Sequence, residues 1–161
     1  SDFVAVVREA LSVTGLAPER LEIEITESTL LYNTDPTLRQ LWALKDLGVA
    51  IAMDDFGTGY SSLSFLNSFP FSKIKIDQSF VRGEQNERSQ ALVRQILTLA
   101  EALRTDTLAE GVETHAQFRR LRDAGCQEAQ GYLISRPMPA DRVADFLASY
   151  QAATDAPQAH S

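Results

Sequence analysis

Helical and strand-like segments alternate along the chain, and this alternation limits the fold more than any single motif does. The helical segments carry apolar residues three or four positions apart, and the strand-like segments are short apolar or alternating runs. Strands that are joined by helices pair in parallel and have helices over the sheet. We expect helices at Phe3 to Gly15, Asp35 to Gly48, Arg88 to Leu103, Thr114 to Ala124 and Asp141 to Tyr150, and strands at 21–25, 49–53, 71–76, 105–109 and 128–133. The last helix is expected to bury Val143, Phe146 and Leu147. The sequence therefore predicts an α/β fold with a parallel sheet.

Composition indicates one compact unit without a nucleic-acid or membrane partner. The chain has 161 residues, 44% of them hydrophobic, which predicts one core over residues 1–150 and a flexible tail at 151–161. Its 22 acidic and 15 basic residues give a net charge of −7, which argues against duplex nucleic acid or an anionic membrane surface as a partner. The single cysteine, Cys126, excludes an internal disulfide, and with no apolar run of membrane-spanning length it favours a cytoplasmic location.

Two adjacent acids, Asp54 and Asp55, follow directly on the apolar run 49–53 and begin the segment DDFGTGYSS. Like charges side by side at the end of a buried strand are costly unless a cation meets them. The glycines at 57 and 59 let a phosphate or a cation approach the backbone closely. For an isolated Asp-Asp pair a simple Asx-type turn is the commoner explanation. The metal-ligand interpretation therefore needs other acids nearby.

Such residues recur where the other predicted strands end, which is where parallel α/β folds gather their working side chains. In the run Lys73 to Asp77 the two isoleucines share one face and Lys75 has the other, so Lys75 can point away from the helices. Carboxylates without histidine or cysteine suit Mg²⁺ or Mn²⁺, and two such ions beside a lysine suit phosphodiester hydrolysis. The polar residues at strand ends are Glu24, Glu27, Asp54, Asp55, Lys75, Asp77, Glu110 and Gln130.

Five ordered segments resemble the EAL family of cyclic di-GMP phosphodiesterases, which fold as a modified (β/α)8 barrel. The resemblance covers about residues 1–148 and implies hydrolysis of cyclic di-GMP to linear pGpG at a site with two Mg²⁺ or Mn²⁺ ions. By this resemblance Glu24, Asp54 and Asp55 match metal ligands, and Asp54 bridges the two ions. The five segments are Glu24–Glu27, DDFGTGYSS at 54–62, Lys73–Asp77, Ala109–Thr114 and Gln130–Leu133.

The same resemblance assigns roles to the remaining residues. Lys75 matches the lysine that contacts the catalytic water, and Glu110 matches a general base or metal-associated acid. Arg136 and Pro137 match residues that border the nucleotide. Supporting roles, such as bracing the DDFGTGYSS loop or orienting water, are implied for Glu27, Asp77, Glu113 and Gln130.

The family's own signature has no counterpart at its expected place. Glu-Ala-Leu occurs at 9–11 and 101–103, but each copy lies in a helical stripe, and Val13 and Thr105 stand where the family has an arginine. The asparagine strand is also missing. A complete barrel has eight strands and roughly 250 residues. The sequence thus predicts an incomplete TIM-type barrel, with about five of eight strands, that alone binds metal weakly and turns over little cyclic di-GMP.

Other interpretations stay open at this stage. A non-catalytic receptor for cyclic di-GMP is the main alternative, although the acids at 24, 54, 55 and 110, which such receptors lose, are present. A kinase-type reading of Asp55-Phe56-Gly57 fails because the chain has no His-Arg-Asp loop and no glycine-rich nucleotide loop. A purely structural fragment is a further alternative. An opened barrel exposes two unpaired strand edges, which predicts either aggregation or a homodimer through edge pairing.

Overall fold

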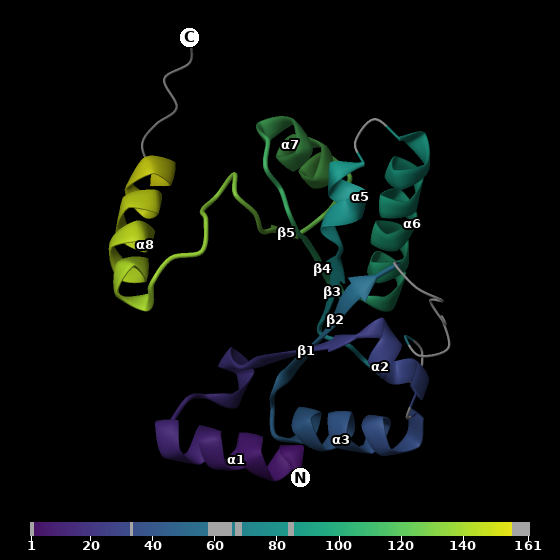
Figure 1. The fold of residues 1–161 in the computed structure, drawn as a ribbon, viewed down its shortest axis with the longest axis vertical. Helices are drawn as coiled ribbons and strands as arrows, with labels where there is room; N and C mark the ends of the chain where they lie inside the picture. Colours follow the sequence, from purple (N-terminus) through teal and green to yellow (C-terminus); the bar gives the residue numbers. More distant parts are fainter. Residues whose placement is uncertain (1, 33, 58–65, 67–68, 84–85, 156–161) are drawn as a thin grey trace.

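The computed structural model describes residues 2–32, 34–57, 66, 69–83 and 86–155. Its sheet has five parallel strands, and their order in the sheet is their order in the chain (Figure 1). The parallel pairing is what the alternation of helices and strands predicts, and this strand order is that of a barrel wall, as the resemblance to the EAL family implies. The strands are β1 (Glu22–Thr26), β2 (Ala50–Phe56), β3 (Lys73–Ile76), β4 (Asp106–Ala109) and β5 (Glu128–Ala129).

Helices connect the strands. Side chains cap the start of α5 (Gln78–Arg82), α6 (Glu87–Leu103) and α7 (His115–Asp123). The Thr114 hydroxyl accepts from the Gln117 amide, and the Gln117 side chain accepts from the Thr114 amide, so α7 begins with a capping box. Asn86 caps α6 and Asp77 caps α5, each with a side-chain oxygen that accepts one hydrogen bond from a backbone amide. The helices are α1 (Phe3–Thr14), η1 (Pro18–Arg20), α2 (Glu27–Tyr32), α3 (Thr34–Asp46), α5 (Gln78–Arg82), α6 (Glu87–Leu103), α7 (His115–Asp123) and α8 (Ala140–Asp155).

The two faces of the sheet differ in chemistry because alternate strand residues point to opposite sides. One face is apolar and forms the main core with the helices, where Leu44 of α3 and Ile96 of α6 are buried. In Figure 1, α1 and α3 lie beside β1 and β2, and α5, α6 and α7 lie beside the later strands. The buried strand residues of this face include Ile51, Met53, Ile74 and Ile76. We call the opposite side the charged face; it carries Glu22, Glu24, Asp54, Lys73, Lys75 and Glu128.

The last part of the chain differs from the sequence prediction in three ways. The fifth strand was predicted to reach residue 133, but β5 ends at Ala129 because the backbone turns at Gly131 and packs on Val112, and Gln130 follows the strand. The prediction that α8 buries Val143 and Leu147 was wrong, since these side chains are 40% and 52% exposed. The helix also continues to Asp155, into the predicted tail, while residues 156–161 lie outside the described part.

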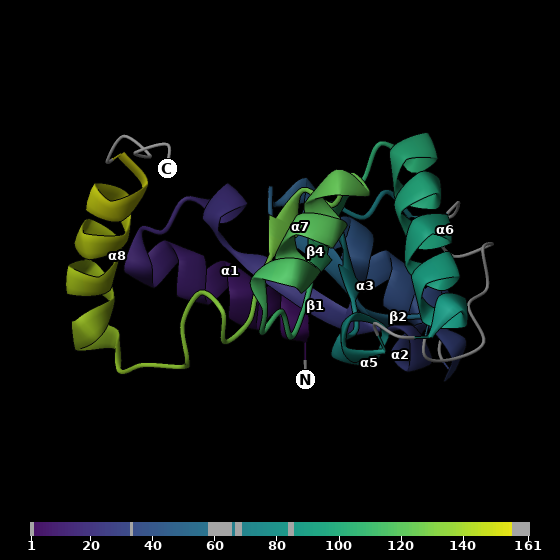
Figure 2. The ribbon, with the colours of Figure 1, turned by 90° about the horizontal axis from the view of Figure 1, so that it is seen from above.

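The physical reason for the exposure of Val143 and Leu147 is that α8 stands apart from the sheet in both views (Figures 1 and 2).

Two short helices, α2 and α5, were not predicted at all. None of the described helices is long and apolar enough to cross a membrane.

Candidate active site

Lys75 is the centre of a group of charged side chains at the carboxyl ends of the strands. Its side chain is 6% exposed, and its ammonium Nζ lies 2.7 Å from Glu24 Oε1, 2.9 Å from Glu110 Oε1 and 3.1 Å from Asp54 Oδ1. The three acids belong to β1, to the residue after β4 and to β2. Because all three oxygens contact one nitrogen, they must lie within two such contact lengths of one another. The structure thus brings together four of the predicted site residues.

The charge on this lysine is stable. Burial by itself lowers the pKa of Lys75, but the contacts with Glu24, Glu110 and Asp54 outweigh it, so the pKa lies well above its ordinary value of 10.5. Three carboxylates nevertheless face a single ammonium. When all are ionised, the group keeps an excess of negative charge, and this favours a further cation.

Asp55 sits on an irregular part of β2. The pairing register of β2 with β3 shifts between Met53 and Phe56, and Asp55 has a φ of 55°, in the left-handed region that few non-glycine residues adopt. Burial, followed by repulsion from Asp54 and Asp77, raises the pKa of Asp55 above its ordinary value, and Lys75 only partly opposes this. The carboxyl of Asp55 is therefore close enough to the other acids to interact with them.

The donor set fits a hard divalent cation in its chemistry. Its oxygens are carboxylates. Asp54 Oδ1 is buried, and although it lies 3.1 Å from Lys75 Nζ, it has no well-directed hydrogen bond to any described residue. Across the described ranges, however, no three His, Cys, Asp or Glu side chains are already arranged to hold an ion. Lys75 lies between the acids instead. The residues that would hold a cation are Glu24, Asp54, Asp55 and Glu110.

The predicted supporting residues lie around this group in different settings. Glu27 begins α2 and is 6% exposed, and neither of its carboxylate oxygens has a hydrogen-bond partner among the described residues. The loop that it is predicted to brace falls largely outside the described part. Asp77 accepts from the Ser79 amide at 2.9 Å and caps α5. Glu113 forms an ion pair of 2.8 Å with Arg82.

A hollow of about 210 Å³ adjoins Glu110 and contains residues that sequence reasoning missed. Its lining includes the predicted Glu113 and Gln130 together with Gln78, Arg82 and Tyr132. Arg82 is the last residue of α5, a helix that was not predicted. The capping residue Asp77, which marks the start of this helix, is the sequence signal that could have located it. The hollow therefore offers one cation, Arg82, beside the carboxylate group.

The two residues predicted to border a nucleotide are placed differently. The guanidinium of Arg136 lies 4.3 Å from the centre of the Tyr132 ring, so it reaches the hollow through Tyr132. Pro137 lines a separate groove along α8 with Met138 and Phe146. The structure thus does not bring Pro137 to the carboxylate group.

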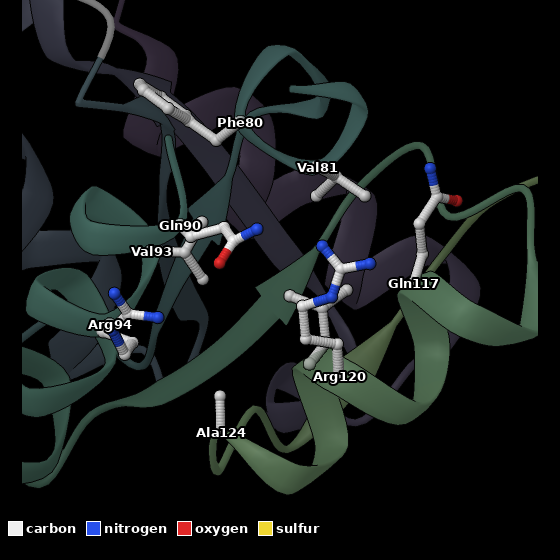
Figure 3. A pocket seen from close by; sticks show the side chains of 9 residues that line it. Phe80, Val81, Gln90, Val93, Arg94, Gln117, Arg120 and Ala124 are labelled. Atoms are coloured by element: carbon white, nitrogen blue, oxygen red, sulfur yellow. The ribbon is translucent and has the colours of Figure 1, made fainter. Parts of the chain in front are cut away.

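Another pocket lies on the helical side of the molecule, between α5, α6 and α7 (Figure 3). It has a volume of about 80 Å³, and Phe80, Val81, Val93 and Leu121 form its apolar wall. None of the residues that line it is a predicted site residue. The acid and lysine chemistry of the described residues is therefore on the charged face and not in this pocket.

Known proteins show close similarity to the chain. NbdA, a cyclic di-GMP phosphodiesterase of Pseudomonas aeruginosa, is 43% identical over 146 residues, which are 90% of this chain and 19% of NbdA. The solved structure of the PaMucR phosphodiesterase in complex with cyclic di-GMP is 42% identical, with a TM-score of 0.86 over 89% of this chain and 58% of that one. BlrP1 of Klebsiella pneumoniae, solved with cyclic di-GMP and calcium or manganese, is 38% identical, with a TM-score of 0.77 over 83% of this chain and 34% of that one.

These comparisons confirm the predicted fold, an incomplete TIM-type barrel, here an open sheet of five parallel strands. The chain spans about a fifth of the length of the curated relative NbdA. The model of the EAL domain matches residues 1–137. On this evidence the chain belongs to the EAL domain family.

Proposed function

We propose that this chain is part of an EAL domain that hydrolyses cyclic di-GMP to linear pGpG. The observation that carries the proposal is the buried ammonium of Lys75 in contact with acids from three separate strand ends. NbdA is named as a phosphodiesterase of this kind, and PaMucR and BlrP1 were solved with the dinucleotide. An anionic substrate needs positive charge at such an acidic site, which Lys75, Arg82 and bound cations would supply.

In this proposal Glu24, Asp54 and Asp55 would hold two divalent cations, Mg²⁺ or Mn²⁺, with Glu110 close by. The calcium and manganese complexes of BlrP1 support a divalent ion, and the all-carboxylate donor set supports a hard one. When bound, such ions lower the pKa of a coordinated water and offset the charge of the phosphate.

Lys75 and Glu110 act on the water and the phosphate. Lys75 has three N–H donors and stays charged, so it can donate to an attacking water and to a phosphate oxygen once it releases part of its contacts with the acids. Glu110, at 2.9 Å from that ammonium, can accept the proton of the water. The hydroxide then attacks phosphorus and the ester bond to the leaving oxygen breaks. The leaving oxygen takes up a proton, which Glu110 can return directly or through solvent, and linear pGpG results.

The supporting residues shape the space around these groups. Glu113 holds Arg82 at the hollow beside Glu110, and Asp77 fixes the start of α5, from which Gln78 and Arg82 project. Gln130 enters the same hollow, and Glu27 stabilises the segment after β2. Arg136 borders the nucleotide through Tyr132. Pro137 is proposed to border the nucleotide as well, from the groove along α8 that it lines.

The decisive experiment separates hydrolysis from binding in the intact protein that contains this chain. Formation of pGpG from cyclic di-GMP is measured with Mg²⁺ or Mn²⁺, and binding is measured by calorimetry with Ca²⁺. Lys75→Met should lower the rate of hydrolysis by at least ~100-fold. The control Lys45→Met, whose ammonium donates to the Pro70 carbonyl and lies over the Phe69 ring, should leave the rate unchanged. If the wild type binds cyclic di-GMP but does not hydrolyse it, the receptor interpretation is favoured instead. If it neither binds nor hydrolyses the dinucleotide, both interpretations are refuted.

Location and partners follow as further parts of the proposal. The only cysteine of the chain, Cys126, donates to the Glu128 carbonyl and is half-buried, which suits a reducing compartment such as the cytoplasm. Cyclic di-GMP is the proposed small-molecule partner, and duplex nucleic acid is not proposed. A homodimer through the open sheet edges is proposed for the isolated chain.

A further inference from the structure

A second group of ion pairs lies beside the first on the charged face. Lys73 Nζ contacts Glu128 Oε2 at 2.9 Å and Glu22 Oε2 at 3.2 Å, and the lysine side chain is 16% exposed. Burial lowers the pKa of Lys73, but the hydrogen bonds with Glu128 and Glu22 outweigh it, so the lysine stays charged. None of the steps proposed above uses these three residues.

The contacts of Lys73 join strands that are far apart in the sheet. Glu22 belongs to β1, Glu128 belongs to β5, and Lys73 lies on β3 between them. In a flat sheet with strands spaced about 4.8 Å apart, β1 and β5 would be separated by roughly 19 Å. One ammonium contacts acids on both strands, which is possible only because the sheet curls around Lys73.

The two groups are adjacent layers of the same face. Lys73 and Lys75 are two residues apart on β3, and Glu22 and Glu24 are two residues apart on β1, so each pair points to the same side. Ala52 lies level with both Glu24 and Lys73 in the strand register and is fully buried. Its small side chain lets the long side chains of β1 and β3 meet over β2.

We propose that Lys73 is a positioning residue, which holds the curvature of the sheet through Glu22 and Glu128 and thereby sets the spacing of the acids around Lys75. Without its ammonium, the carboxylates of Glu22 and Glu128 would face one another and repel. The strands that carry them would move apart, and Glu24 on β1 would move with them. The inference rests on the proposed function in one respect, since it takes the acids around Lys75 to bind a divalent cation.

The test compares variants of Lys73 in the intact protein, with Mn²⁺ affinity measured by electron paramagnetic resonance and with kcat and KM measured separately. Lys73→Met should weaken Mn²⁺ binding about tenfold or more, as loss of a residue that orients metal ligands does. It should lower kcat more than it raises KM. Lys73→Arg keeps a cation within reach of both Glu22 and Glu128, so this variant should retain most of the Mn²⁺ affinity.

Two further variants separate positioning from other effects. Val93→Ala removes a buried side chain of α6, away from the charged face, and serves as the control. It should lower the thermal stability about as much as Lys73→Met does, but leave the Mn²⁺ affinity unchanged. The triple variant Glu22→Gln, Lys73→Met, Glu128→Gln removes the repulsion together with the ammonium. It should remain impaired, because the contacts that hold the curvature are missing.

Two results would overturn the proposal. Unchanged Mn²⁺ affinity in Lys73→Met, at a lower melting temperature, would make Lys73 merely structural. Full recovery in the triple variant would show that charge balance alone matters. If the wild type binds Mn²⁺ but produces no pGpG, the proposed function fails, and the Mn²⁺ comparison still decides the role of Lys73.

Discussion

Lys75 and Glu24 form an ion pair of 2.7 Å although β1 and β3 are not neighbours in the sheet. β2 lies between them, and its inward residue at this level is Ala52. A larger residue there would occupy the space in which the two long side chains meet. The acids around Lys75 therefore depend on a small neighbour as much as on their own charges.

Replacing Lys75 by methionine should affect both stability and catalysis. The ammonium is almost fully buried, and its removal leaves three carboxylates without their cation. Breaking such a buried pair should lower the free energy of unfolding by about 3 kcal/mol. Loss of the group that orients the water should lower kcat by at least ~100-fold. Urea unfolding and single-turnover kinetics measure the two effects, and a variant with wild-type kcat would contradict the role proposed for Lys75.

The stability lost in Lys75→Met should not depend on pH between neutrality and pH ~10. The folded-state pKa of Lys75 lies above the ordinary value of 10.5. Its stabilising contribution is therefore complete below pH 10.5 and is lost only as the pH rises through the higher folded-state value. Urea unfolding of both proteins at several pH values measures the difference. If the difference in free energy of unfolding between the wild type and Lys75→Met already disappears between pH ~7 and ~9, the contacts of Lys75 do not hold its proton.

In the absence of metal, Asp55→Asn should stabilise the protein. The variant should also lack the stabilisation that Mn²⁺ gives to the wild type. The raised pKa means that the folded state binds the proton of Asp55 more tightly, so ionised Asp55 destabilises the fold as the pH rises through that pKa. Asparagine removes the charge and tolerates the left-handed φ of this position. We expect a gain of roughly 0.5 kcal/mol or less without metal. Thermal melts with and without Mn²⁺ test this, with Asp145→Asn on exposed α8 as the control.

Gly131→Ala should be far more damaging than Gly125→Ala. A Cβ at Gly131 would lie 2.2 Å from the carbonyl oxygen of Val112, and this backbone cannot move without disturbing the turn next to Glu110. Overpacking of this kind lowers the free energy of unfolding by about 3 kcal/mol. Gly125 has a φ of 93° but open space around its Cβ position, so alanine there meets only backbone strain of about 1 kcal/mol. Equal melting temperatures for the two variants would contradict the tight packing of Gly131.

The isolated 161-residue chain should bind Mn²⁺ weakly, release little pGpG and associate through its sheet edges. β1 and β5 are the outer strands of the described sheet, and their free backbone groups can pair with a second copy. Light scattering of the chain and of the intact protein measures the association. A monomeric chain with the turnover of the intact protein would refute this expectation.

Much of the site could be predicted because it follows from strand periodicity. Alternation along Lys73 to Asp77 separates Lys75 from the two isoleucines, and the structure buries Ile74 and Ile76 on the apolar face as this pattern requires. The ends of parallel strands meet at one edge of a sheet, which is why Glu24, Asp54 and Glu110 could be expected together. Their separation in the chain did not matter.

Other features depend on packing that a local pattern does not contain. The apolar stripe of α8 indicates that Val143 and Leu147 favour a partner, but not whether the chain supplies one. The left-handed backbone of Asp55 comes from the register shift in β2. The double contact of Lys73 comes from the curvature of the whole sheet. Neither the shift nor the curvature is visible in residue spacing.

The identical order of the strands in the chain and in the sheet has a consequence for how the protein is made. Each newly synthesised strand can join the edge left by the one before it, and no existing pair has to open. During synthesis Glu24 and Asp54 therefore precede Lys75, and Glu110 is the last member of the group to be added. Nascent chains should acquire their charged centre stepwise, from the amino end onward.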